Sequence, residues 1–277
     1  MGESTFRIDN QETEEERRLG HLMLQEAKDR AKPLIESWIT YSSPDEESHL
    51  RSVDRLTPYN PLSYQLRTFL NVAIDSIRTT LRYVEVTNEI PMVAHYSLIR
   101  TSVEASSYGI WLLSAGRKEK QAWLSLRLSY ENTQELDGLE KVFLQASMPA
   151  PDREPIKQRL IELQQNLKAY RTHDITQRST TTDVIANADK SFGKRKHETS
   201  GLQVWKACSG PAHGNGAVIT ALLEREPIGS ESEYGQTFLM TSRLTVTGMF
   251  LLVAIENAER LLELLGQQGR KNIPNFS

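Results

Sequence analysis

The chain has 277 residues, of which 38% are hydrophobic and 25% charged, and its formal net charge is −3. Proteins that coat nucleic acid or bind anionic membranes normally carry a large basic excess, so this composition argues against both classes. The single cysteine, Cys208, excludes an intramolecular disulfide and a metal cluster of several cysteines, and it favours a reducing cytoplasm.

The first part of the chain predicts helices that are separated by prolines. Residues 1–10 are polar, and we expect them to be flexible. A helix follows from Gln11 with acidic residues in its first turns, and Pro33 is expected to kink or break it. Asn60 and Pro61 are typical of an N-cap and a first helical residue, so they predict the start of a second long helix.

The segment from Pro91 to Gly116 predicts a helix that is buried on nearly all sides. Asn88 is expected to cap its start, and Gly116 is placed to end it in a left-handed conformation. Its only formal charges are Arg100 and Glu104, at i,i+4 spacing. Because buried charges are costly, we expect polar groups from distant parts of the fold to contact these two residues.

Two more helices are predicted over residues 117–147 and 155–171, with Asp152 as the cap of the second. Residues 172–200 are polar and poor in large apolar side chains. They predict a long excursion that contains one short helix over residues 183–192.

The C-terminal part opens with the glycine-rich segment SGPAHGNG, residues 209–216, which is expected to turn sharply and not to form a helix. Residues 217–223 fit a short strand or a short helix equally well. A long last helix is predicted over residues 236–265, and residues 267–277 are expected to be flexible.

Together these patterns predict a single all-α domain over residues 1–277, an irregular multi-helix bundle with the 91–116 helix buried at its centre. No membrane association is expected. The longest uncharged runs, residues 105–116 and 244–255, are shorter than the ~20 apolar residues that a membrane-spanning helix needs.

Residues that suit catalysis or ligand binding occur in two of these helices and in the glycine-rich segment. They are Arg100, Glu104, Arg127, Glu131, Ser209, His213 and Gly214. Arg127 and Glu131 repeat the i,i+4 spacing, and a short turn at Gly116 would make the two helices antiparallel neighbours. One interpretation is a pocket in which arginine holds an anion such as phosphate while glutamate or His213 moves a proton. The other is a buried ionic network that fixes the helix register.

Other site chemistries are less well matched by the sequence. Ser209 and His213 resemble a nucleophile and a base, but no G-x-S-x-G motif surrounds the serine. The chain contains neither an H-E-x-x-H motif nor a nucleotide-binding glycine loop, so we expect no metal and no cofactor. The basic run at residues 194–197 fits either a nucleic-acid contact or a solvated loop.

Residues 90–265 resemble a group of uncharacterised bacterial, especially actinobacterial, all-helical proteins through the strings LIRTSVEASSYGIWLL and WKACSGPAHGN. The shared pattern is R-x-x-x-E-A, then W-L-L, and later S-x-x-x-H-G, which places Arg100, Glu104, Trp111, Ser209, His213 and Gly214 at the matching positions. This resemblance implies an all-helical fold and no particular reaction. A more distant resemblance is to the HEPN group of metal-independent ribonucleases and nucleotide-modifying toxins, whose R-x4-6-H motif is absent from the start of the last helix here.

We therefore expect a cytoplasmic bacterial protein with an internal polar site, formed by Arg100, Glu104 and His213, that is structural or binds a ligand. The first alternative is an RNA- or nucleotide-directed toxin or defence enzyme, with His213 as the acid or base. The second is a module that forms a homodimer through its helices.

Overall fold

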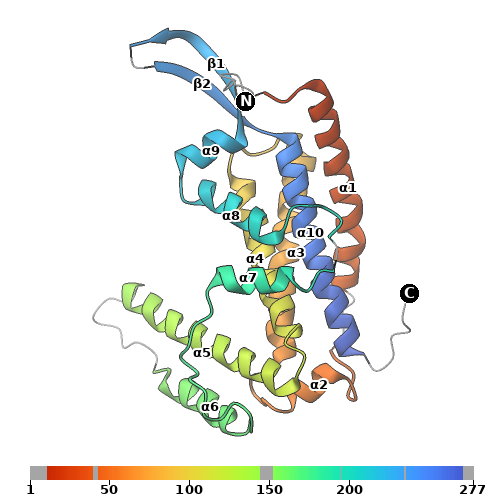
Figure 1. Cartoon of the computed structure of the whole chain (residues 1–277), viewed down its shortest axis with the longest axis vertical. Coiled ribbons are helices and arrows are strands. Elements are labelled where there is room, and N and C mark those ends of the chain that lie inside the picture. The colour runs from red at the N-terminus through yellow and green to blue at the C-terminus, as the bar shows by residue number, and fades with distance from the viewer. Residues whose placement is uncertain (1–10, 40–42, 144–151, 194, 234, 271–277) are drawn as a thin grey trace, which may run out of the picture. The chain divides into compact units, whose positions relative to one another are not determined.

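The computed structural model describes residues 11–39, 43–143, 152–193, 195–233 and 235–270, which form ten helices and one two-stranded hairpin (Figure 1). The all-α prediction is confirmed. The elements are α1 (Glu14–Ile39), α2 (His49–Asp54), α3 (Leu62–Thr87), α4 (Ala94–Leu113), α5 (Lys118–Phe143), α6 (Glu154–Gln165), α7 (Thr181–Asp189), α8 (Gly201–Ala212), α9 (Gly216–Leu222), β1 (Leu223–Ser232), β2 (Gly235–Ser242) and α10 (Leu244–Gly269). No helix in the described part of the chain is both long and apolar enough to cross a membrane.

The contacts within the chain divide it into two compact units. Unit 1 comprises residues 1–40, 71–107 and 192–259, and unit 2 comprises residues 41–70, 108–191 and 260–277. Helices α3, α4 and α10 each supply residues to both units, and the expected single domain stays a prediction.

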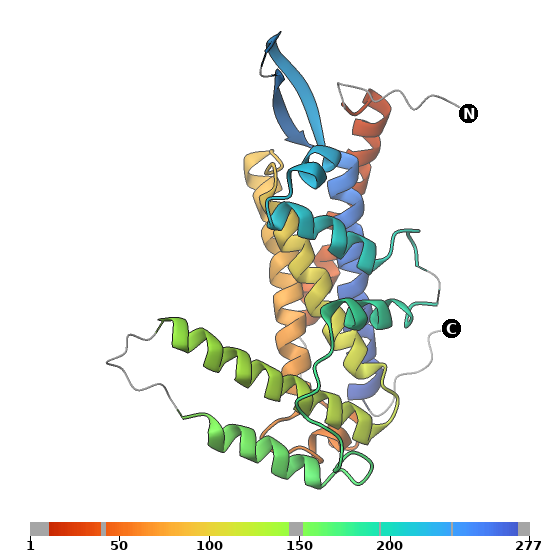
Figure 2. The ribbon, with the colours of Figure 1, turned by 60° about the vertical axis from the view of Figure 1, so that its left-hand side comes forward.

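In unit 1, α1 lies beside α10 in both views (Figures 1 and 2). Glycines line this contact. A Cβ atom on Gly20 would lie 2.7 Å from the backbone carbon of Leu244, and one on Gly248 would lie 2.7 Å from the Cβ of Met23. Both distances are well inside van der Waals contact. The two helices can therefore approach this closely only because the two positions lack side chains.

The first turn of α10 is capped by a residue that is far away in the sequence. The Glu12 carboxylate accepts hydrogen bonds from the backbone N–H groups of Leu244, at 2.9 Å, and Thr245, at 2.8 Å. A carboxylate at a helix N-terminus satisfies N–H groups that have no partner within the helix and suits the helix dipole. This contact joins the segment before α1 to the start of α10.

The predicted burial of the 91–116 segment is confirmed in α4. Its exposed positions are Ala94, Ser97 and Thr101. Gly116 follows the helix with φ +74°, the predicted left-handed conformation. The prediction that Asn88 caps α4 is wrong, because Asn88 has φ +55° and its N–H donates to Val84 O, which makes it the end of α3.

Two prolines lie inside helices, although the sequence predicted a kink or a break at Pro33 and no helix around Pro211. Helix α1 continues through Pro33 to Ile39, and α8 continues through Pro211 to Ala212. The glycine-rich segment is therefore helical in its first half, contrary to the prediction. Gly210 is needed for packing and not for a turn, since a Cβ there would lie 2.9 Å from a methyl carbon of Val218 in α9. The sharp turn comes at Gly214, with φ +68°.

The predicted start of the last helix is also wrong. Residues 235–242 form β2, which pairs antiparallel with β1 from Leu223 opposite Ser242 to Ile228 opposite Thr237. Exposed and half-buried side chains alternate along β2, the pattern of a strand with two different faces. Helix α10 begins only at Leu244 and reaches Gly269, so residues 267–269 are helical, while residues 1–10 and 271–277 lie outside the described part.

The remaining boundaries differ from the prediction by up to six residues, the largest difference being the end of α6 at Gln165 instead of residue 171. The open choice at residues 217–223 is decided in favour of a helix, α9, and the short helix of the polar excursion is α7. Arg153, and not Asp152, is the N-cap residue of α6, although the Asp152 carboxylate accepts the Glu154 N–H at 3.0 Å. Residues 144–151, at the predicted end of the 117–147 helix, lie outside the described part.

A buried amide connects several elements of unit 2. The Gln121 side chain of α5 donates to Leu113 O and to the Gln268 side chain, both at 2.9 Å. Its carbonyl oxygen lies 2.9 Å from the ring nitrogen Nε2 of His49 in α2. Because its polar atoms are paired, this buried glutamine holds the end of α4, α2, α5 and the end of α10 in one arrangement.

Candidate functional site

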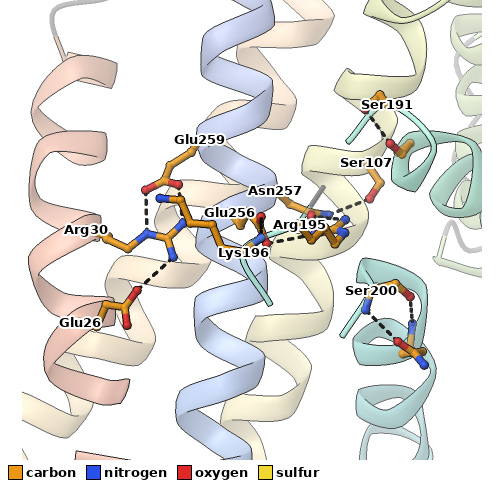
Figure 3. Close-up of polar contacts among 12 residues, drawn as sticks. Glu26, Arg30, Ser107, Ser191, Arg195, Lys196, Ser200, Glu256, Asn257 and Glu259 are labelled. Carbon is orange, nitrogen blue, oxygen red and sulfur yellow. Dashed lines mark hydrogen bonds and ion pairs between the residues drawn. The ribbon is translucent and has the colours of Figure 1, made fainter. Parts of the chain in front are cut away.

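Helix α8 brings two polar side chains onto α4 within unit 1. Its start is fixed by a capping box, in which the Ser200 hydroxyl accepts the Gln203 N–H and the Gln203 side chain accepts the Ser200 N–H (Figure 3). Val204, Cys208 and Pro211 share one face of the helix and are buried. This burial sets the rotation of α8 and turns the neighbouring residues Trp205 and Ser209 toward α4.

The α4–α8 cluster consists of Arg100, Glu104, Trp205 and Ser209. Arg100 Nη2 lies 3.3 Å from Glu104 Oε2, and Arg100 Nε donates to Ser209 Oγ at 3.0 Å. The Trp205 indole N–H donates to the same Glu104 oxygen at 2.7 Å, while the Arg100 guanidinium carbon lies 5.1 Å from the centre of a Trp205 ring. The distant partners that the sequence required for the two charges are therefore Trp205 and Ser209.

The α4–α8 cluster remains accessible to water. The side chains of Arg100 and Glu104 are 28% and 29% exposed. The Ser209 hydroxyl donates to Trp205 O at 2.7 Å and accepts from Arg100, so both of its hydrogen-bonding roles are used. Within the described part of the chain, Arg100 Nη1 has no acceptor, which leaves one edge of the guanidinium free for a ligand.

His213 and Gly214 lie one helical turn beyond Ser209. His213 is the C-cap residue of α8, and its N–H donates to Ser209 O at 3.1 Å. Its ring is exposed, and no described residue hydrogen-bonds to it. The structure thus places His213 beside the α4–α8 cluster along α8 but does not join it to Arg100 or Glu104. Gly214 then turns the chain toward Asn215, the N-cap of α9.

Arg127 and Glu131 have other partners, within unit 2. Arg127 Nε donates to Gln177 O at 2.9 Å and Nη2 donates to Ser179 Oγ at 3.1 Å, while Glu131 lies 3.8 Å from Arg178. Burial lowers the pKa of Arg127 and raises that of Glu131. These two residues fasten the start of the polar excursion to α5, a role that the sequence did not predict.

A deeply buried ion pair in unit 1 comes from the basic run. Arg195 and Glu256 are only 10% and 9% exposed, with Nη1 and Oε2 3.4 Å apart. Arg195 Nη2 also donates to Asn257 Oδ1 at 2.9 Å, and Asn257 Nδ2 donates to Ser107 at 3.2 Å (Figure 3). The Lys196 N–H donates to Glu256 as well. Arg195 is therefore a structural residue, neither a solvated side chain nor a free contact for nucleic acid, and Lys194 lies outside the described residues.

A second ion pair holds α1 to α10. Arg30 Nε and Nη2 donate to the two carboxylate oxygens of Glu259, at 3.1 and 2.6 Å (Figure 3). Burial lowers the pKa of Arg30, but the bonds to Glu259 outweigh burial and raise this pKa above its ordinary value. The bidentate geometry fixes the two helices in both position and rotation.

Unit 1 also buries three titratable groups that are neutral at pH 7. Burial lowers the pKa of His95 to about 4 and raises the pKa of Tyr96 to about 12. Burial also raises the pKa of the Cys208 thiol far above its ordinary value, so this cysteine is a poor nucleophile. His95 Nε2 lies 3.1 Å from Thr247 Oγ1 and ties α4 to α10.

A cavity of about 680 Å³ in unit 1 lies where the start of α1, the end of α3 and the base of the hairpin meet. Its most buried carboxylates, Glu12 and Glu224, are already occupied. Glu12 caps α10, and Glu224 accepts both Arg17 Nη2, at 3.1 Å, and Thr241 Oγ1, at 3.2 Å. These groups stabilise the base of the hairpin, so the two carboxylates are not free to bind a ligand.

In the described part of the chain, no group of three or more His, Cys, Asp or Glu side chains is arranged to hold a metal ion. Comparison of the chain with protein-family models, with curated proteins and with solved structures finds no match.

Proposed function

We propose that the protein binds a ligand with a phosphate or similar oxyanion at the α4–α8 cluster. The observation that carries the proposal is the free edge of Arg100: Glu104, Ser209 and Trp205 hold its guanidinium in place, while Nη1 has no described acceptor and the side chain reaches water. Guanidinium donors fixed in this way suit phosphate oxygens, because little conformational entropy is lost on binding.

The charges around the α4–α8 cluster favour an anion over a cation. Glu104 is already bonded to Arg100 and to the Trp205 indole N–H. Lys206 is exposed and lies three residues before Ser209, on a neighbouring part of the α8 surface. The two positive charges of Arg100 and Lys206 exceed the single negative charge of Glu104.

An RNA- or nucleotide-directed enzyme is the second candidate function, and the exposed ring of His213 favours it. This ring has no described hydrogen-bond partner and lies one turn from Ser209, so it is free to accept or donate a proton beside a bound phosphate. Arg100 would then stabilise charge that develops on the phosphate oxygens.

Location in the cytoplasm and a homodimer are further parts of the proposal, and light scattering coupled to size-exclusion chromatography tests the dimer.

Binding of a short single-stranded RNA and of inorganic phosphate to the full chain tests the proposed function. We expect RNA binding that weakens as salt increases, and roughly five- to tenfold weaker binding in Arg100→Lys and His213→Gln at unchanged melting temperature. Arg18→Lys and His21→Gln change exposed residues of α1 in the same way and are expected to bind like wild type. No saturable binding, or a melting temperature that falls in Arg100→Lys while binding is unchanged, would support the structural interpretation instead.

Expression in a bacterial host tests the enzymatic candidate. A toxin inhibits growth, and His213→Ala is expected to abolish the inhibition without lowering the melting temperature, because the ring is exposed. Growth inhibition that persists in His213→Ala at equal protein level removes His213 from the chemistry.

A further inference from the structure

A second cavity, of about 560 Å³, lies within unit 2 between α5, α6 and the turn before α3. Helices α5 and α6 run side by side in both views (Figures 1 and 2). The residues that line this cavity include Tyr59, Asn60, Asn132, Ile156, Arg159 and Leu160. A cavity of this volume holds a small molecule of nucleotide size.

Tyr59 lines the cavity with an exposed side chain and an unusual backbone conformation. Its side chain is 83% exposed, and its backbone has φ +74°, a conformation that costs energy for any residue except glycine. The turn is held on both sides, because the Asn60 N–H donates to Thr57 O and the Thr57 hydroxyl donates to Asn60 O, both at 3.0 Å. The strained backbone conformation of Tyr59 therefore places an exposed aromatic ring at the cavity, at some cost in conformational energy.

Among the described residues that line this cavity, Arg159 alone carries a formal charge. Its guanidinium carbon lies 5.0 Å from the centre of the Tyr59 ring, and Nη1 donates to Glu162 at 3.0 Å. In the described residues, no acceptor contacts Nε or Nη2. A guanidinium held against an aromatic ring, with free donors, favours an anionic group next to a flat ring.

The rest of the wall combines fixed amides with an apolar surface. The Asn60 side chain donates to Ser125 at 3.3 Å and accepts from Ser129 at 2.7 Å, so its orientation is fixed. The Asn132 amide is exposed and has no described partner. Ile156 is half exposed at the rim and Leu160 is buried behind it, which together provide an apolar surface for a ring.

We propose that this cavity binds a small molecule that carries a flat aromatic or heteroaromatic ring and one anionic group. The ring stacks on Tyr59 and lies against Ile156, the anionic group binds the free donors of Arg159, and Asn132 hydrogen-bonds to the polar edge of the ring. A mononucleotide and an aromatic carboxylate both have this chemistry. The site is separate from the α4–α8 cluster in residues and in unit.

Calorimetric titration of the full chain with adenosine monophosphate, adenosine and indole acetate tests the proposal and distinguishes the two sources. Tyr59→Gly is the decisive variant, because glycine relieves the positive φ and keeps the fold while the stacking surface is lost. We expect roughly tenfold weaker binding in Tyr59→Gly, and binding like wild type in Tyr59→Phe.

Arg159→Gln is expected to weaken the binding of adenosine monophosphate or of indole acetate. The same variant should leave any binding of adenosine, which has no anionic group, unchanged. Tyr64→Ala removes another exposed tyrosine of unit 2 that does not line the cavity, and it should bind like wild type. Binding that survives Tyr59→Gly, or no saturable binding of any probe at millimolar concentration, overturns the proposal. A ligand that binds at the α4–α8 cluster would bind more weakly in Arg100→Lys and equally well in Tyr59→Gly. The two variants therefore distinguish failure of one proposed site from failure of the other.

Discussion

The indole N–H of Trp205 in α8 donates a 2.7 Å hydrogen bond to Glu104 in α4, across 101 positions of sequence. The bonded oxygen is the one nearest the Arg100 guanidinium, which itself lies over the Trp205 rings. One tryptophan therefore orients both members of the ion pair. This contact decides whether the pair can serve as a binding site, because an arginine that moves freely loses more entropy on binding.

Trp205→Phe keeps one aromatic ring near Arg100 and removes the N–H donor together with the second ring of the indole. We expect the free energy of unfolding to fall by about 1–2 kcal/mol, since a hydrogen bond to a charged group is lost and water partly replaces it. Urea unfolding measures the change. Trp111→Phe is the matched control, because no described residue accepts a hydrogen bond from the Trp111 indole, and a loss as large in the control would assign the effect to packing.

Gly20→Ala is expected to destabilise the contact between α1 and α10. The new methyl group would lie 2.7 Å from the backbone of Leu244 and Thr245, so the helices must separate, at a cost of about 1–3 kcal/mol. Gly138→Ala in α5 should stabilise by about 0.5–1 kcal/mol, because no neighbouring atom lies within 4 Å of its Cβ and glycine is unfavourable inside a helix. Thermal unfolding distinguishes the two, and equal effects would contradict the close packing of α1 on α10.

Arg195→Met leaves the Glu256 carboxylate buried without its cation. We expect a loss of roughly 3–5 kcal/mol in the free energy of unfolding, and partial recovery in the double variant Arg195→Met/Glu256→Leu, since an apolar pair carries no desolvation cost. Arg82→Met is the control, because its ion pair with Glu85 is largely exposed to water and contributes little to stability. A double variant less stable than Arg195→Met would contradict the argument.

His95 predicts a specific pH dependence of stability. Burial lowers its pKa from 6.5 to about 4 in the folded protein, so the unfolded chain binds the proton first as the pH falls. The contribution is complete above pH 6.5 and is lost progressively toward pH 4, by roughly 3 kcal/mol in all. His95→Gln lacks this titration, so its unfolding free energy should fall less over the same range. Parallel curves for wild type and variant would show that His95 does not titrate in this way.

The sequence by itself determined most of the helices and the presence of polar residues that need partners. The spacing of apolar residues predicted most of the helices, because this periodicity is a local property of the sequence. Gly116 adopts the predicted left-handed conformation, because glycine alone takes it without cost. The i,i+4 spacing of Arg100 and Glu104 likewise predicted an ion pair within one helix turn.

Where local signals compete, only the tertiary structure decided the outcome. It also decided which distant groups meet. Pro33 and Pro211 lie inside helices because packing of the surrounding residues outweighs one lost backbone bond, and residues 235–242 form a strand because they pair with β1. The partners of Arg100, the burial of Arg195 and the cavity beside Tyr59 depend on side chains brought together from separate helices. No sequence spacing encodes such contacts, since they follow from the packing of the whole fold.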